Sequence, residues 1–331
     1  MNILGVESSC DETAAAVVSG ARRPALVSSV VSSQVAIHAP FGGVVPELAS
    51  RSHIRFITEV MAEALKKARL KPENIDRVAA TAGPGLMGSL LVGLTAARTF
   101  AWLFRKPFVP VNHTEAHIMA AFLEKPALKL PLLALVASGG HTELIYMKKH
   151  GSYRILGRTR DDAAGEAYDK VAKLLKLGYP GGPALERLAR RSRSPVRLPV
   201  ARMKDGSLDF SFSGLKTAVA QSTVTDRAAL AAGFQQAVIA ALIGRAREAL
   251  ALTRARTLVL AGGVAANLGL RNAFGELGRQ VRVSLVVPRI GLCTDNAAMI
   301  ACAAWFNPSA RRGMRVPADS GWQAGRAIGA G

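Results

Sequence analysis

Apolar and polar positions alternate along this chain with two different periods. Short runs rich in Val, Ala, Leu and Ile are typical of strands, and longer segments with apolar residues every three or four positions are typical of helices. The pattern predicts helices at 47–70 and 88–104 in the first part of the chain. It predicts strands around them, at 2–6, 14–18, 26–33, 76–82 and 108–111. Strands that alternate with helices in this way indicate an α/β protein.

The second half of the chain starts the same pattern again. Predicted strands at 132–137 and 143–147 flank a polar turn, just as 2–6 and 14–18 flank the turn 8–13. Hairpins are common enough for this to be a coincidence. However, both turns are rich in serine and hydrogen-bond donors, and each begins a lobe-sized segment. We therefore expect a duplicated unit with two hairpins that face phosphate.

The remaining pattern completes a two-lobed arrangement, which 331 residues also suggest. Helices are expected at 161–175 and 184–190, a mainly helical region after 210–216 that runs to 252, and strands at 257–260 and 282–287. We expect a first lobe at 1–112, completed by the helix 295–310, and a second lobe at 113–294 that includes the helix 113–123. Residues 311–331 are basic and Gly-rich, and we expect weak order there.

Charge changes this picture, because 43 Lys and Arg against 23 Asp and Glu give a net charge of +20. Such a surplus indicates a polyanionic partner, either nucleic acid or an acidic membrane, unless the proteome is itself rich in Arg. The basic loop 187–204 is a candidate for contact with a phosphate backbone, or simply a solvated loop. Its candidate contacts are Arg190, Arg191 and Arg193.

Cysteine content and the chain's start point to the cytoplasm. The three cysteines show no Cys-x-x-Cys spacing and their odd number gives no disulfide framework, as expected in a reducing compartment. The first residues read as a strand rather than a secretory signal. We found no uninterrupted apolar run long enough to span a bilayer, so no membrane association is expected.

The candidate chemistry begins with two histidines, His113 and His117. Their spacing of four residues places both on one helical face, where they can bind a divalent metal. Asn112 is expected to cap this helix, with Glu115 completing a capping box. Asp295 would make a two-His, one-carboxylate site suited to Fe(II) or Zn(II). Two half-buried histidines without a metal, and a helix cap at Asp295, are equally compatible with the sequence.

Glycine-rich turns at 138–140, 181–182 and 262–263 suggest a second site. Backbone N–H groups in such turns can approach a phosphate closely. None of the turns has the Gly-Lys-Ser/Thr ending of a Walker A sequence, and each alone is explained by a tight turn. Together, in a two-lobed α/β chain, they suggest a nucleotide in the cleft.

The histidine pair also raises the question of a zinc protease, whose helix carries His-Glu-x-x-His with a general-base Glu beside the first His. Here Glu115 is two residues after His113, about 200° around the helix and away from the metal. Protease chemistry is therefore disfavoured.

Taken together, these segments closely resemble one family, the tRNA adenosine threonylcarbamoyltransferases. The matching motifs follow the family's order and lie at 5–13, 42–51, 81–86, 112–117, 138–142, 161–170, 179–183, 210–216, 262–267 and 293–298. The resemblance implies an actin/hexokinase-like (ASKHA) fold, in which two ribonuclease-H-like lobes enclose a nucleotide cleft. Ala116 and Glu186 stand where many members have Gly and Asp, and neither change should alter its position's role.

The resemblance also implies an activity. The threonylcarbamoyl group of threonylcarbamoyl-AMP would pass to the N6 amine of the adenosine 3′ of the anticodon (position 37), in tRNAs reading codons that begin with A, and AMP would leave. His113, His117 and Asp295 would bind one metal, with Fe(II) favoured and Zn(II) possible. The contacts to substrate, or to ATP, ADP or AMP in the same cleft, would be Val136, Ala137, Ser138, Gly139, Gly140, Asp169, Gly182, Glu186 and Asn267.

Other expectations are less specific. Asp11 and Glu12 lie in the first hairpin turn, where one of them could accept a proton, or both could simply order the turn or contact a metal. The turn is of the bacterial kind, and bacterial members work in the cytoplasm with a paralogous subunit lacking the metal site and a small P-loop ATPase. A separate enzyme makes the adenylate. The rivals are an ATP-dependent small-molecule kinase of the same fold, a metalloprotease and an actin-like nucleotide switch.

Overall fold

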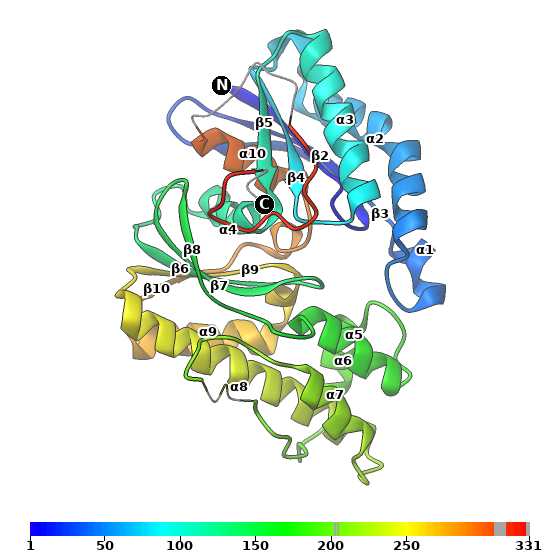
Figure 1. The fold of residues 1–331 in the computed structure, drawn as a ribbon, viewed down its shortest axis with the longest axis vertical. Coiled ribbons are helices and arrows are strands. Elements are labelled where there is room, and N and C mark those ends of the chain that lie inside the picture. Colours follow the sequence, from blue (N-terminus) through cyan, green and yellow to red (C-terminus); the bar gives the residue numbers. More distant parts are fainter. Residues whose placement is uncertain (202, 204, 308–315, 329–331) are drawn as a thin grey trace.

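The computed structural model describes residues 1–201, 203, 205–307 and 316–328 of the chain. Two lobes lie one above the other, with the N-terminal strands in the upper lobe of Figure 1 and helices α5 to α9 in the lower. Each lobe is built on one five-stranded sheet. This arrangement agrees with the α/β class and the two lobes expected from the sequence.

The first sheet has the strand order β3-β2-β1-β4-β5. Its strands are β1 (Asn2–Glu7), β2 (Glu12–Ser19), β3 (Ala25–Ser33), β4 (Arg77–Gly83) and β5 (Phe108–Asn112). The β1–β2 and β2–β3 pairs are antiparallel, whereas β1–β4 and β4–β5 are parallel. The lobe therefore begins with the antiparallel strands β1 to β3. The parallel strands β4 and β5 come after them in the chain and are reached through helical connections.

The second sheet repeats this plan. Its strands are β6 (Leu132–Ala137), β7 (Thr142–Lys149), β8 (Ser152–Arg158), β9 (Thr257–Ala261) and β10 (Ser284–Val286). Their order is β8-β7-β6-β9-β10, with two antiparallel pairs followed by two parallel pairs. The two sheets thus share order and direction strand for strand, which confirms the duplicated ribonuclease-H-like unit.

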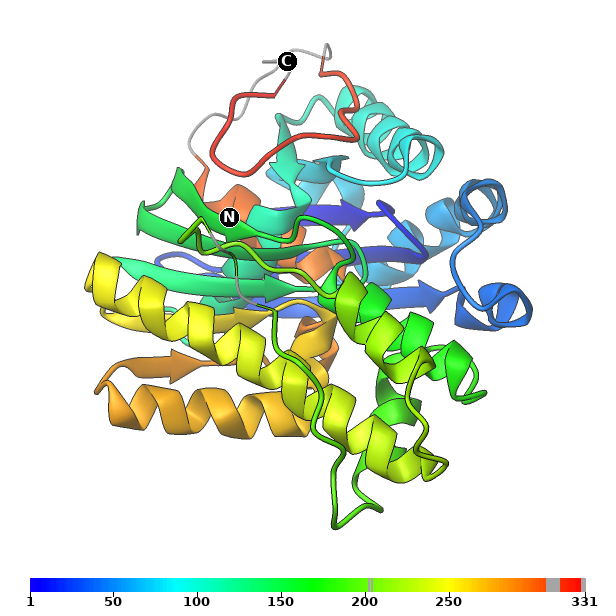
Figure 2. The same ribbon diagram turned by 60° about the horizontal axis from the view of Figure 1, so that its bottom comes forward.

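The helices form layers on both faces of both sheets. Short α1 (Val35–His38), α2 (Pro46–Ala68) and α3 (Met87–Leu103) belong to the first lobe, and α2 and α3 cover the outer face of its sheet. The outer face of the second sheet is covered by α5 (Ala164–Leu174), α6 (Gly181–Ala189), α7 (Ser213–Ala220), α8 (Arg227–Thr253) and α9 (Leu268–Gln280). Figure 2 shows α8 and α9 side by side on that face.

The middle layer consists of α4 (His113–Glu124) and α10 (Ala297–Phe306). Ala116 and Ala120 of α4 pack with α10 against the first sheet, while Ile118 and Phe122 pack against the second. A helix buried on all sides must be apolar on all sides, as α10 is along its length and α4 is after its polar first turns. The two histidines at the start of α4 are therefore held between the lobes by packing from both.

Most predicted elements are present, with ends shifted by a few residues. The helices predicted at 47–70 and 88–104 are observed as α2 and α3. The helix expected from residue 161 starts later, at Ala164, because Asp161 instead accepts the backbone N–H of Phe212. The helix expected at 184–190 starts earlier, at Gly181. Strand β8, which the apolar pattern did not reveal, forms the edge of the second sheet.

The C-terminal residues include a segment packed on the protein. Residues 316–328 lie within the range 311–331 for which we expected weak order, yet Val316 and Trp322 are buried against the first lobe. The other residues of that range lie outside the described part of the chain.

Within the described residues, α8 is the one helix long and apolar enough to cross a membrane. Half of its apolar window is buried in the protein, where Phe234, Val238 and Leu242 join the core of the second lobe. These are the properties of a core helix.

Candidate metal centre

The site begins where β5 ends and α4 starts. Asn112 closes the strand, and its Oδ1 accepts the backbone N–H of Glu115 at 3.1 Å, which confirms the predicted N-cap. The other half of the predicted capping box is wrong. The Glu115 carboxylate turns to the C-terminal segment, where Oε1 accepts the N–H of Gly325 at 2.8 Å. Glu115 is therefore not beside the metal ligands, as a zinc protease would require.

The structure brings the three predicted metal ligands together. Asp295 Oδ1 lies 3.5 Å from Nε2 of His113 and 3.2 Å from Nε2 of His117. One ligand atom from each residue falls within a group less than 4.8 Å across. Asn296, not Asp295, caps α10 by accepting the N–H of Met299 at 3.0 Å. The Asp295 carboxylate is thus left to face the histidines.

The donors in this group suit a divalent metal. His117 is only 1% exposed, and neither of its ring nitrogens has a hydrogen bond within the described residues. Its Nε2 approaches Asp295 closely but without hydrogen-bond geometry. Buried polar atoms are almost always paired, so an imidazole left in this way needs a partner. Two imidazoles and one carboxylate match the ligand preferences of Fe(II) and Zn(II).

Electrostatics support the same interpretation. Burial opposes a charge on His113, but the carboxylates of Asp295 and Glu7 outweigh it and raise the pKa of His113 to about 10. Burial likewise opposes a charge on Asp295, yet the two histidines hold its pKa well below the usual value. Burial lowers the pKa of His117. The buried Glu7 carboxylate and the partly exposed Asp295 carboxylate thus demand positive charge between them, which a proton or a metal cation can supply.

Glu7 also belongs to this candidate site, and the sequence reasoning missed it. It ends β1, is fully buried, and places Oε2 3.1 Å from His113 Nδ1. Thr81 Oγ1 donates to the same oxygen at 2.5 Å, and the N–H of Ser9 donates to Oε1 at 2.6 Å. A carboxylate behind a metal-binding histidine fixes the ring's orientation and tautomer. The available signal was an acid at the end of a mainly apolar strand.

The glycine-rich turn after β6 lies next to the metal group. His141 of this turn has its ring centroid 6.4 Å from that of His113. Burial, and after it the nearby His113 and His117, lower the pKa of His141 to about 4, so this ring stays neutral. The predicted substrate segment 136–140 precedes it, and a Cβ on Gly139 or Gly140 would meet no atom within 4 Å. Backbone groups here therefore border open space beside the metal ligands.

A second glycine turn joins this one across the sheet. Val136 of β6 is paired with Ala261 of β9, so Gly262 and Gly263 follow directly beside Ala137. Gly262 has φ of +87°, and a Cβ there would lie 2.3 Å from the Ala137 carbonyl oxygen. Only glycine allows this approach.

The other predicted substrate contacts lie around the start of two helices. Asp169 accepts the N–H of Gly181 at 2.7 Å, next to Gly182, whose Cα faces open space. Glu186 accepts the N–H of Leu268 at 2.9 Å. Asn267 caps α9 by accepting the N–H of Leu270 at 2.9 Å. Glu186 and Asn267 thus meet at the start of α9, and both already have structural bonds.

The turn between β1 and β2 carries the two candidate proton acceptors. Burial raises the pKa of Asp11, and the nearby charge of Asp295 raises it further. Burial raises the pKa of Glu12 to about 7, although Ser33 donates a hydrogen bond to it. Oε2 of Glu12 is buried without a hydrogen bond in the described structure.

The candidate tRNA contacts lie at the end of α6. Arg190, Arg191 and Arg193 are all exposed. Arg190 pairs with Glu186 at 2.8 Å, so the basic group continues from the predicted substrate contacts.

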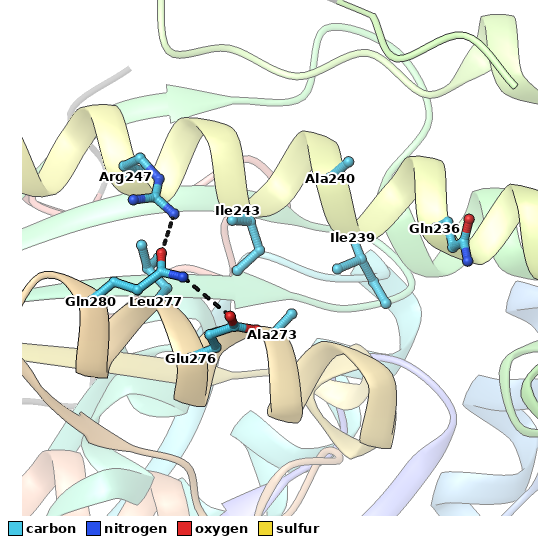
Figure 3. A pocket seen from close by; sticks show the side chains of 9 residues that line it. All are labelled: Gln236, Ile239, Ala240, Ile243, Arg247, Ala273, Glu276, Leu277 and Gln280. Atoms are coloured by element: carbon cyan, nitrogen blue, oxygen red, sulfur yellow. Dashed lines mark hydrogen bonds between the residues drawn. The ribbon is translucent and has the colours of Figure 1, made fainter. Parts of the chain in front are cut away.

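A groove of about 310 Å³ lies elsewhere, between α8 and α9 on the outer face of the second lobe (Figure 3). Its wall is apolar at Ile239 and Ile243 and polar at one end, where Arg247 donates to Gln280 at 2.7 Å. None of its lining residues belongs to the predicted site.

Comparison with known proteins identifies the family of this chain. The family model described as TsaD, tRNA N6-adenosine threonylcarbamoyltransferase, matches residues 25–302. The tRNA N6-adenosine threonylcarbamoyltransferase of Geobacillus thermodenitrificans is 51% identical over 310 residues, covering 91% of this chain and 90% of the relative. That of Symbiobacterium thermophilum is 51% identical over 337 residues, covering 99% and 97%.

Solved structures establish the fold independently. A full-length HypF in its phosphate- and nucleotide-bound form has a TM-score of 0.65 at 14% identity, covering 93% of this chain and 47% of that one. The (R)-2-hydroxyglutaryl-CoA dehydratase component A of Acidaminococcus fermentans has a TM-score of 0.57 at 17% identity, covering 92% and 99%. These likenesses confirm the actin/hexokinase-like fold. Because the family model and the relatives span most of the sequence, the chain belongs to the tRNA N6-adenosine threonylcarbamoyltransferase family.

Proposed function

We propose that the group of His113, His117 and Asp295 is the centre at which this protein transfers a threonylcarbamoyl group to tRNA. The donor is threonylcarbamoyl-AMP, the acceptor is the N6 amine of the adenosine at position 37 in tRNAs reading codons that begin with A, and AMP leaves. The convergence of these three side chains, in a chain of this family, is the observation that carries the proposal. A small-molecule kinase of the same fold is not favoured, because it has no use for the histidine pair.

The metal we favour is Fe(II), with Zn(II) as the alternative, one ion per subunit. When bound, such an ion polarises a carbonyl group of the donor, which an exocyclic amine needs because it is a weak nucleophile. Glu7 keeps Nδ1 of His113 engaged, so that Nε2 is directed at the Asp295 side of the group. The side chains thus hold a fixed set of donors before substrate arrives.

The adenylate is expected along the two glycine turns. Backbone N–H groups at Ser138, Gly139 and Gly140 suit its phosphate, since anions bind readily to such turns. Val136 and Ala137 lead into this turn, and Asp169, Gly182, Glu186 and Asn267 are proposed to contact the nucleoside. ATP, ADP or AMP would occupy the same place. The open space beside Gly139, Gly140, Gly182 and Gly263 supports this position.

Proton transfer is assigned to the turn that carries Asp11 and Glu12. The attacking amine loses a proton as the new bond forms, and a side chain with a pKa near neutrality accepts it best. Glu12, whose pKa is raised to about 7 and whose Oε2 is buried without a hydrogen bond in the described structure, is the better candidate. Asp11 would then order the turn.

The setting of the reaction follows from the family. We propose contact between tRNA and Arg190, Arg191 and Arg193, and a cytoplasmic complex with a paralogous subunit that lacks the metal site and a small P-loop ATPase. We also propose that residues 1–112 and 295–310 form one functional lobe and 113–294 the other. The packing of α10 on the first sheet supports that division.

A transfer assay tests the function. The purified protein is mixed with fresh threonylcarbamoyl-AMP, unmodified tRNA and the partner proteins, and the nucleosides are analysed by mass spectrometry. Product with the natural protein and none with His113→Ala is expected. No product with intact adenylate and all partners present would contradict the proposal.

A further inference from the structure

The residues 316–328, which we name the C-terminal strap, lie across the start of α4. In Figures 1 and 2 the strap is the red segment that passes between α3 and the strands of the second lobe. The metal site and the substrate turns do not include it. Its contacts nevertheless reach Asn112 and Glu115, which lie one on each side of His113 in the sequence.

The strap is fixed to the first lobe at the end of β4. The N–H of Asp319 donates to the Ala82 carbonyl at 2.8 Å, and Arg98 donates to the Val316 carbonyl at 3.3 Å. A Cβ on Gly83 would lie 1.8 Å from the Asp319 carbonyl oxygen, so the strap needs a glycine beneath it. Trp322 is 9% exposed and packs in the core beside α3.

From this base the strap makes one hydrogen bond to each side of His113. Asn112 donates from Nδ2 to the Trp322 carbonyl at 2.9 Å, while its Oδ1 caps α4. Gly325 donates its N–H to Glu115 Oε1 at 2.8 Å. Asn112 therefore both caps α4 and bonds to the strap. Glu115, which faces away from the metal group, adds a second hydrogen bond between α4 and the strap.

The strap also touches the second lobe. A Cβ on Gly325 would lie 2.4 Å from the carbonyl oxygen of Tyr153 in β8, which shows how closely the two backbones approach. Tyr153 in turn donates from its hydroxyl to Met119 of α4 at 3.5 Å. The strap thus contacts the start of α4 and also packs against β8 of the second lobe.

We propose that the C-terminal strap positions His113 for metal binding by holding the first turn of α4 at Asn112 and Glu115. These are positioning residues, because neither belongs to the donor group. His113 must point at both Glu7 and Asp295, and a small rotation of the first turn would separate its Nε2 from the other two donors. This inference rests on the metal role proposed above.

Two full-length variants test the two hydrogen bonds from the strap to Asn112 and Glu115. Asn112→Ser keeps an oxygen that caps the helix but loses the bond to Trp322. Glu115→Ala loses the bond to Gly325, and Glu115→Gln restores an acceptor. Arg326→Ala, on the strap with an exposed side chain, is the matched control. Metal affinity is measured by chelator competition with Zn(II), and ligand geometry by the visible absorption of bound Co(II).

We expect Asn112→Ser and Glu115→Ala to weaken metal binding roughly 10-fold to 100-fold, the range typical of outer contacts to metal ligands. The Co(II) spectrum should change as well, while Glu115→Gln and Arg326→Ala match the natural protein. A merely structural contact would lower the unfolding temperature and leave both metal readouts unchanged. That result, at a temperature where every variant is folded, would overturn the proposal.

Hydrogen exchange of the metal-free protein separates this proposal from the proposed function. We expect the amides at 113–117 to exchange faster in Glu115→Ala and not in Glu115→Gln. If the natural protein bound no metal, the proposed metal role would fail. The strap proposal would fail if the amides at 113–117 exchanged no faster in Glu115→Ala than in Glu115→Gln and the natural protein.

Discussion

Glu7 places a full negative charge at the buried end of β1, next to the apolar residue Val6. Burial alone would raise the pKa of this carboxyl, but the facing His113 outweighs the burial and holds the pKa below its usual value. A buried carboxylate is costly unless it is paired. The buried Glu7 carboxylate is therefore best explained by a positive charge that it stabilises, either on His113 or on a metal bound to the other nitrogen of that ring.

Replacing this charge should weaken the metal site. Glu7→Gln keeps the shape of the side chain but removes the charge, so we expect metal affinity to fall roughly 10-fold to 100-fold. Chelator competition measures the change, and Glu59→Gln on the exposed face of α2 is the control. An affinity equal to that of the control would show that Glu7 does not support the ligand.

A second acid, the partly buried Glu143 at the start of β7, should affect stability rather than metal binding. Burial raises its pKa to about 7, against an attraction to Arg158. Since the folded pKa exceeds the usual glutamate value of 4.5, the stabilisation from protonation is complete below about pH 4.5 and is lost as pH rises to about 7.

Glu143→Gln removes this pH dependence. We expect the variant to be more stable than the natural protein by about 1–3 kcal/mol at pH 8, and nearly equal to it at pH 4.5. Urea unfolding at the two pH values gives the comparison, with Glu59→Gln as the surface control. Equal free energies of unfolding at pH 8 would mean that Glu143 is already ionised at little cost.

The residues that sequence reasoning found and missed differ in a physical way. His113, His117 and Asp295 were identifiable because metal ligands have a limited set of types and His113 and His117 share a helix. The tight turn at Gly262 was identifiable for the same reason, since few residues allow it. Glu7 and His141 were not assigned, because their roles come from contacts across the sheet that no local spacing encodes.

At the scale of elements, the approach of α10 to β1 decides where Asp295 lies. Gly5 of β1 makes this approach possible, because a Cβ there would lie 2.4 Å from the Ala297 carbonyl oxygen and 2.7 Å from the Ala301 nitrogen. Asp295 and its neighbour Asn296 come immediately before this contact. The helix and the metal ligand are therefore positioned together by the absence of one side chain.

Gly5→Ala should move α10 and disturb the ligand. We expect a loss of stability of about 1–3 kcal/mol, as for other overpacked cores, together with weaker metal binding. Gly244→Ala in α8, where a Cβ would meet no atom within 4 Å, should instead be neutral or stabilise by up to about 1 kcal/mol. Thermal unfolding and chelator competition give the two readouts. Similar results for both variants would contradict the packing argument.

Element prediction succeeded where the pattern was local. Asn112 was predicted as a cap because the signal lies within four residues, and α2 and α3 because they show helical spacing along their length. The strap was missed, since its buried Trp322 and Val316 are separated by polar and glycine residues and it has no regular structure. Its order comes from contacts with β4, α3 and α4, which are more than 200 residues away in the chain.

At the scale of the molecule, the two sheets enclose α4 and α10 in a common middle layer. The three candidate metal ligands come from the starts of these two helices, so any change in how the lobes pack should alter the geometry of the candidate metal site. The duplication was predictable from two similar hairpins, because strand order follows from chain connectivity. The packing between the lobes was not, since it depends on side chains from both halves.

The net charge of +20 sets the last expectation, for tRNA. If Arg190, Arg191 and Arg193 contact phosphates, replacing all three by Gln should weaken binding and make the slope of log K against log[salt] less negative by about 2 to 3. Fluorescence anisotropy over a range of salt measures this slope. The matched control replaces Arg22, Arg23 and Arg105, which are exposed on the first lobe. An equal change in both triple variants would show that binding follows the overall charge and not the end of α6.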